Sequence, residues 1–289
     1  RRRPRFYEND EIAWAPQLTG RRILMAISHA PLVMPGQDHI HRSSVLNGIA
    51  RWARHLDRAG PRMAPGMAKV EAAAGLLGAS LMLPGAEDQM ARAEKLLEAA
   101  IADQLLPDGA PLSRCPLDLA QMAELMAHLE AFHTARGKAV ARVVSETRAH
   151  ARSALATLAM GDGVPASWHG GQPTREQIAR IAPKAAAGRI TGYQRLAAGG
   201  VTILVDVGPP PLARHNHHAH ASTLAFTMSD GARPLIVSCG SERGPEGLRP
   251  YPPELVAGLR STAGHSALVL ADTNSSRLGA GGKRGGGEE

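Results

Sequence analysis

Four histidines fall within six positions of this chain, in the segment from Arg214 to Ser222. They are His215, His217, His218 and His220, and a fifth histidine, His265, follows in the segment from Arg260 to Ser266. Imidazole is the side chain that changes charge near neutral pH, and it also ligates zinc. The cluster therefore indicates proton-transfer chemistry, a metal site, or both.

A metal site in this cluster would need ligands from two segments of the chain. Two histidines from one segment and one from another can hold zinc, with a carboxylate or water completing the set. Asp206, Asp230 and Asp272 are near in sequence, but nothing in the sequence places them at the site. A polar loop, or an adventitious metal site, is the alternative explanation of the cluster.

The cluster directly precedes a predicted strand, 222–228. Alternate residues of an extended segment share a face, so His218 and His220 should point the same way, together with Asn216. His217 should face the opposite side. His265 begins another predicted strand, 266–270, after the turn residues at 263–264.

The first half of the chain has the apolar spacing of helices, interrupted by Pro and Gly. The predicted helical segments are 16–33, 41–59, 66–83, 86–106, 116–135 and 138–160. Helices joined by short Pro/Gly connections indicate antiparallel hairpins stacked in series.

After about residue 160 the pattern changes to loops and then to short segments rich in β-forming residues. The predicted strands are 190–197, 201–207, 222–228, 234–239 and 266–270, preceded by a short helix within 174–187. The fold class predicted is therefore multidomain α and β. A helical region, 1–165, is followed by a linker, 166–189, and a partial antiparallel β-sandwich, 190–289.

Composition favours a globular protein with an acidic partner. Of 289 residues, 44% are hydrophobic and 20% are charged, and the net charge is +7. That charge suits an anionic polysaccharide, a membrane surface or nucleic acid, but no nucleic-acid-binding motif is present. No apolar run is long enough for a transmembrane helix, and no signal peptide is visible. Oligomeric state is not indicated.

Four consecutive pieces of the second half resemble the heparinase II/III-like polysaccharide lyases. They are 191–196, like that family's first sandwich strand; 218–226, like its His-x-His-Ala-Asp-x-Leu-x-Phe segment; 231–240, like its Gly-x-x-Pro-Leu-Leu-Val-Asp-x-Gly segment; and 260–266, like its Arg-Ser-Thr-x-x-His-Asn segment. Their order and spacing agree. The helical half is similar, more loosely, to the last part of the family's (α/α) toroid.

The resemblance implies β-elimination of a uronate-containing glycan in the cell envelope or periplasm. His218 matches the family's catalytic histidine, and His220 and His265 match two ligands of a structural zinc. The third ligand in the family is an aspartate, and here that position is Ser238. Because a hydroxyl is a poorer zinc ligand than a carboxylate, this replacement is expected to weaken zinc binding.

The chain also departs from the family's toroid motifs, which place a catalytic tyrosine there. None of its three tyrosines falls in the helical segment after 108–109, where the motif would put one. Tyr193 is predicted chiefly to pack in the first strand, with catalysis as the alternative. Arg114 could bind a substrate carboxylate, cap a helix or pair with Asp118. Asn47 and Glu71 are predicted to be structural, with charge neutralisation as the alternative.

These departures leave three classes of function open. The first is a lyase with His218 as acid/base. The second is a non-catalytic member of the same fold that binds envelope glycans, which the missing toroid tyrosine and Ser238 favour. The third is a zinc hydrolase, which would require stoichiometric metal.

Overall fold

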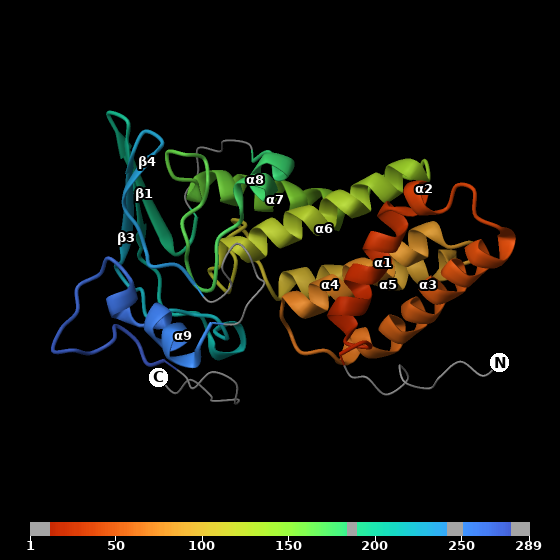
Figure 1. Cartoon of the computed structure of the whole chain (residues 1–289), viewed down its shortest axis with the longest axis horizontal. Helices are drawn as coiled ribbons and strands as arrows, with labels where there is room; N and C mark the ends of the chain where they lie inside the picture. Colours follow the sequence, from red (N-terminus) through yellow and green to blue (C-terminus); the bar gives the residue numbers. More distant parts are fainter. Residues whose placement is uncertain (1–11, 184–189, 242–250, 279–289) are drawn as a thin grey trace. The chain divides into compact units, whose positions relative to one another are not determined.

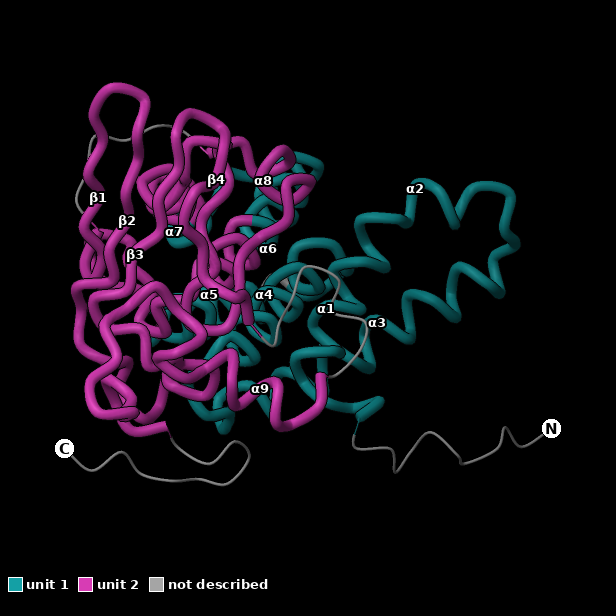
Figure 2. Tube along the Cα trace, turned by 60° about the vertical axis from the view of Figure 1, so that its left-hand side comes forward, with its two compact units in different colours: residues 1–103, 124–147 teal, residues 104–123, 148–289 magenta. Residues whose placement is uncertain are grey.

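The structure is a computed structural model that describes residues 12–183, 190–241 and 251–278 (Figure 1). It divides into two compact units, one formed by 1–103 with 124–147 and the other by 104–123 with 148–289 (Figure 2). These units are defined by contacts between residues. The predicted domains, 1–165, 166–189 and 190–289, are defined by the change from helices to strands, so that division stays a prediction. Residues 184–189 of the predicted linker lie outside the described residues.

The first unit is helical. It contains α1 (Pro16–Ser28), α2 (Ala30–Val33), α3 (His39–Ala59), the 3-10 turn η2 (Gly60–Arg62), α4 (Met67–Met82) and α5 (Glu87–Ala102). Helices α6 (Pro116–Ala135) and α7 (Arg142–Leu158) contribute residues to both units. Each of the six helical segments predicted from the sequence contains a helix, because the apolar spacing and the Pro/Gly interruptions are local signals.

Helix α4 is the centre of the first unit. Its residues from Val70 to Leu81 are all buried. Helix α1 crosses it closely, because both helices have a glycine at the crossing: a Cβ added to Gly75 would lie 2.3 Å from the Cα of Gly20. The charged side chain of α4 that is buried, Glu71, pairs with Arg21. Asn47, the residue predicted together with Glu71 to be structural, is exposed on α3.

The second unit is built on a four-stranded antiparallel sheet of order β1-β2-β3-β4. The strands are β1 (Tyr193–Ala198), β2 (Val201–Asp206), β3 (Phe226–Asp230) and β4 (Arg233–Ile236). The β1–β2 hairpin turns at Gly199-Gly200, whose φ angles of 57° and 90° fit the two-residue turn that suits twisted strands. Register pairs Tyr193 with Asp206, so both lie at the same end of the sheet.

The other elements of this unit are short. They are α8 (Arg175–Ile181), the 3-10 turns η3 (Ala213–His215) and η4 (Thr262–Gly264), and α9 (Pro253–Arg260). The predicted short helix within 174–187 is α8, which begins at a capping box formed by Thr174 and Gln177. Helix α9 has no counterpart among the predicted elements. The core of the unit packs Trp168, Tyr193 and Leu204 against the start of α6 and the end of α7.

Two of the five predicted strands need correction. The predicted strand 222–228 begins only at Phe226, because Ser222 to Ala225 form a turn in which the Ala225 N–H donates to the Ser222 carbonyl at 2.9 Å. Leu224 has a φ of 62° in that turn, which a strand cannot contain. Residues 266–270 form no strand at all. Their only ladder contact is an isolated bridge from Leu270 to Thr273.

No helix in the described parts of the chain is long and apolar enough to cross a membrane.

Candidate functional site

The centre of the site is Asp206, the last residue of β2, which is fully buried. Its carboxylate accepts hydrogen bonds from Arg114 Nη2, from His169 Nε2 at 3.0 Å and from Ser222 Oγ at 2.7 Å. Burial acts to raise the pKa of this carboxyl. The hydrogen bond from His169 and the charge of Arg114 outweigh that effect and hold the pKa below its usual value. Asp206 is therefore a buried, paired carboxylate.

His169 bridges Asp206 to the histidine cluster. The backbone N–H of His220 donates to His169 Nδ1 at 3.2 Å, so the ring proton resides on Nε2 and is donated to Asp206. Burial lowers the pKa of His169, although the neighbouring carboxylate acts in the opposite direction. His169 is thus a neutral imidazole with a defined tautomer. Its φ of 41° shows a tightly turned loop.

Arg114 is enclosed by backbone as well as by Asp206. Its Nη1 donates to the Pro209 carbonyl at 2.6 Å, and its Nη2 also donates to the Gly192 carbonyl at 2.7 Å. Glycine is required on both sides of the guanidinium, since a Cβ at Gly192 or at Gly208 would come within 2.8 Å of it. These contacts favour a structural role for Arg114. Binding of a substrate carboxylate stays a prediction.

Other carboxylates considered from the sequence lie apart from this network. Asp118 accepts a hydrogen bond from Ser113 at 2.6 Å. Asp230 and Asp272 are exposed. Only the tertiary structure distinguishes Asp206 from these neighbours in sequence.

Tyr193 lies inside the core beneath Arg114. Its hydroxyl donates to the Arg114 carbonyl, its ring centroid lies 5.0 Å from the Arg114 guanidinium carbon, and it packs against Trp168 with ring centroids 5.8 Å apart. Burial raises the pKa of the Tyr193 hydroxyl well above its usual value. A phenol so placed favours the packing role, and catalysis stays the alternative prediction.

Two backbone segments are clasped together to form the histidine cluster. Arg260 Nε donates to the Ala219 carbonyl at 3.0 Å, and the Ala221 N–H donates back to the Arg260 carbonyl at 2.9 Å. Thr262 Oγ1 donates to the Ala221 carbonyl at 2.8 Å. The Arg-Ser-Thr sequence therefore positions the histidine that follows it against the His-rich segment.

The predicted metal ligands His220, His265 and Ser238 form a continuous hydrogen-bonded chain. His220 Nδ1 lies 3.1 Å from His265 Nε2, and His265 Nδ1 lies 2.8 Å from Ser238 Oγ. Burial, followed by the neighbouring His265, lowers the pKa of His220 to about 2. Burial also lowers the pKa of His265, to about 4. Both rings are neutral at neutral pH.

This donor set does not fit zinc. The hydroxyl of Ser238 contacts Nδ1 of His265, whereas the nitrogen of His265 that faces His220 is Nε2. A metal between the two rings would therefore lie on the opposite side of the His265 ring from Ser238. Among the described residues, no group of three or more His, Cys, Asp or Glu side chains is placed to hold a metal. Zinc needs three or four protein ligands.

His218 and His220 do not share a face as predicted. His220 is buried and His218 is exposed, because the segment turns rather than extends: the Ala219 N–H donates to the Asn216 carbonyl at 3.0 Å. His217 is exposed as well. His218 rests on Gly170, where an added Cβ would lie only 2.5 Å from the Cβ of His218. The loop that carries His169 thus supports His218 from below.

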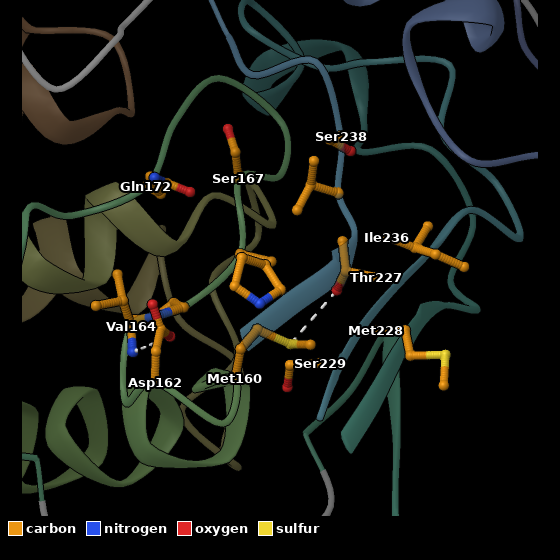
Figure 3. A pocket seen from close by; sticks show the side chains of 14 residues that line it. Met160, Asp162, Val164, Ser167, Gln172, Thr227, Met228, Ser229, Ile236 and Ser238 are labelled. Atoms are coloured by element: carbon orange, nitrogen blue, oxygen red, sulfur yellow. Dashed lines mark hydrogen bonds between the residues drawn. The ribbon is translucent and has the colours of Figure 1, made fainter. Parts of the chain in front are cut away.

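A cavity of about 180 Å³ lies beside Ser238, between the loop at 160–172 and strands β3 and β4 (Figure 3). Its polar lining residues are Asp162, Ser167, Gln172, Thr227, Ser229 and Ser238, and the rest of its lining is apolar. Ser238 is therefore shared between the cavity and the histidine chain.

Solved structures that superpose on this chain include heparinases. A heparinase III superposes with a TM-score of 0.69 at 14% identity, over 92% of this chain and 47% of that one. A mutant of the heparan sulfate lyase HepC from Pedobacter heparinus superposes with a TM-score of 0.66 at 14% identity, again over 92% and 47%. Identity this low shows the fold alone. It confirms the predicted class, an (α/α) toroid portion followed by an antiparallel β-sandwich.

Sequence comparison assigns the family. Residues 180–289 match the family described as Heparinase II/III-like, C-terminal. This match agrees with the resemblance that the motifs predicted. FtsZ-localized protein C of Caulobacter vibrioides is 26% identical over 248 residues, which are 81% of this chain and 42% of that protein. The chain spans less than half the length of these relatives.

Two residues of the network, His169 and Ser222, were missed from the sequence, and Asp206 was named without being placed at the site. The signal for His169 was present as a histidine directly before Gly170-Gly171, in a segment interpreted only as a loop. Asp206 ends an alternating strand, which is a common place for a site residue. Nothing local identified Ser222, whose role depends on the position of β2.

Proposed function

We propose that this chain is part of a heparinase II/III-like protein that cleaves an anionic, uronate-containing glycan in the cell envelope or periplasm. His218 is its acid/base. The observation that carries the proposal is the contrast in burial among the three predicted catalytic side chains: His218 is exposed, whereas Tyr193 and Arg114 are buried. An exposed histidine whose backbone is supported by buried residues is suited to proton transfer.

The reaction is a β-elimination. A base removes the proton at C5 of the uronate, which lies α to the carboxylate, and the electron pair forms the C4–C5 double bond as the C4–O bond breaks. The leaving glycosidic oxygen then takes a proton. His218 is assigned one or both of these transfers. The close approach of Gly170 fixes the distance between His218 and the loop that carries His169. The hydrogen bond from Arg260 to the Ala219 carbonyl holds the backbone next to His218.

A second candidate, a glycan-binding protein without turnover, is favoured by a different observation. Among the described residues, the Tyr193 hydroxyl is buried and donates a hydrogen bond to the Arg114 carbonyl. The raised pKa of this hydroxyl also disfavours its ionisation. If no other residue of the protein supplies a second proton-transfer group, the site would bind glycan without cleaving it.

Incubation with a panel of uronate-containing glycans, followed by the ultraviolet absorbance of the unsaturated product, tests the first candidate. His218→Ala should lower the rate at least a hundredfold, the lower end of typical acid/base contributions of about 10²–10⁴. The matched control is His217→Ala, because His217 is the exposed neighbour. Equal rates in the two variants would reject His218. Glycan binding without product in the wild type would select the second candidate.

A further inference from the structure

The chain of contacts from His220 through His265 to Ser238 occupies the place where the family resemblance implies a zinc ion. We infer that this protein braces its site with a metal-free His–His–Ser hydrogen-bond relay, in which the proton order runs from His220 to His265 to Ser238. The inference concerns how the site is held together, and it does not depend on whether the chain cleaves glycan.

The first argument is that the nitrogens a metal would need are already used. His220 Nδ1 and His265 Nε2 face each other at 3.1 Å, a hydrogen-bond distance. One of the two facing nitrogens carries the proton of this hydrogen bond, so each ring serves as the hydrogen-bond partner of the other.

The second argument concerns the third ligand. Ser238 Oγ binds the far nitrogen of His265 at 2.8 Å, so it extends the relay instead of closing a coordination sphere. Among the described residues, no carboxylate or thiol completes a three-ligand set with the two histidines. The buried carboxylate of Asp206 accepts hydrogen bonds from three donors of its own, Arg114, His169 and Ser222.

The direction of the relay follows from the one ring nitrogen without a partner. His220 Nε2 is buried and has no hydrogen-bond partner among the described residues. A buried N–H without an acceptor is costlier and rarer than an unused acceptor. His220 therefore carries its proton on Nδ1 and donates to His265 Nε2. His265 in turn carries its proton on Nδ1 and donates to Ser238.

The direct test is zinc content. The full chain is purified with added zinc, desalted, and analysed for metal by mass spectrometry. The expected result is far less than one zinc per chain, with a melting temperature that neither zinc nor a chelator changes. Stoichiometric zinc that survives desalting, or a melting temperature that falls on chelation, would overturn the inference.

The second test reads the tautomers by nitrogen-15 NMR of the histidine side chains. The expected result is that both His220 and His265 carry their proton on Nδ1. Zinc-shifted ring nitrogens, or a proton on Nε2 of both rings, would overturn the relay as drawn. This readout needs no variant, so it does not depend on any substitution folding.

Variants of Ser238 provide the third test. Ser238→Ala removes the end of the relay and should lower the melting temperature by about 2–4 °C, the equivalent of one hydrogen bond in a chain of this size. Ser238→Thr keeps the hydroxyl and should restore most of the loss. Ser266→Ala is the matched control, because its hydroxyl makes only a 3.3 Å contact near the same segment. Equal stability of Ser238→Ala and wild type would contradict the relay.

Discussion

Asp206 places a negative charge in the interior of the second unit, and its surroundings compensate for the lost water. A cationic guanidinium, an imidazole N–H and a hydroxyl all donate to one carboxylate. A buried ion pair of this kind adds little net stability compared with an apolar core, but losing one partner leaves the other charge uncompensated. The network is therefore a strong constraint on the positions of its members.

Replacing Asp206 by asparagine tests that constraint. Asp206→Asn keeps the shape but leaves the buried Arg114 without its counter-charge, so the free energy of unfolding should fall by about 3–5 kcal/mol. Urea unfolding followed by circular dichroism measures it. Asp230→Asn, at the exposed end of β3, is the matched control and should change stability by less than about 0.5 kcal/mol. Similar losses in both variants would contradict the assigned role.

Acid should weaken the same network in a defined pH range. The pKa of Asp206 is lower in the folded chain than in the unfolded chain, so the unfolded chain binds the proton first as the pH falls. Its stabilisation is fully present above the unfolded value, about pH 4, and is lost as the pH falls through the folded value. The difference in unfolding free energy between wild type and Asp206→Asn should be constant near neutrality and shrink below about pH 4. A constant difference across this range would refute the lowered pKa.

At the scale of elements, the contact between α1 and α4 depends on the absence of two side chains. The helix backbones come close together because neither Gly20 nor Gly75 has a side chain, and a side chain at either position would push the helices apart. Glycine inside a helix costs about 0.5–1 kcal/mol relative to alanine. Close packing of the two backbones is what offsets that cost.

Alanine at Gly75 should therefore destabilise the first unit. The added Cβ would meet the Cα of Gly20 at 2.3 Å, which forces the helices apart, and a loss of about 1–3 kcal/mol is expected from overpacking. Gly48→Ala on α3 is the control, because nothing lies within 4 Å of its added Cβ, and it should be neutral or slightly stabilising. Thermal unfolding of the two variants compares them. A Gly75→Ala variant as stable as Gly48→Ala would show that the helices are not in close contact.

At the scale of the whole molecule, the net charge of +7 predicts how salt would affect binding of the anionic glycan in the proposed function. Long-range attraction between a basic protein and an anionic polymer is screened over about 8 Å at physiological salt and about 3 Å at 1 M. Affinity for an anionic glycan should therefore fall several-fold between these conditions, as measured by calorimetry. A neutral glycan of the same length is the control. Affinity that does not depend on salt would contradict an electrostatic mode of binding.

The helices of the first half of this chain were predictable because their signals are local. Apolar residues at three- and four-residue spacing and Pro/Gly boundaries predicted all six helical segments. The strands were harder to delimit, because the segment before β3 has β-forming residues but folds as a turn. The conformation of this turn is set by two backbone hydrogen bonds to Asp206, a residue on another strand. The Leu224 N–H donates to the Asp206 carbonyl, and the Asp206 N–H donates to the Ala225 carbonyl.

The candidate site was predictable in its parts but not in its connections. The motifs predicted that His218, His220, His265 and Ser238 belong together, and three of them are indeed linked by hydrogen bonds. The sequence by itself determined the resemblance to the family and the order of most elements, because these depend on residue types along the chain. Only the tertiary structure decided that His220 is buried while His218 is exposed, that Asp206 is the central carboxylate, and which nitrogen of His265 faces Ser238. Those facts depend on where segments distant in sequence meet, and no local pattern contains them.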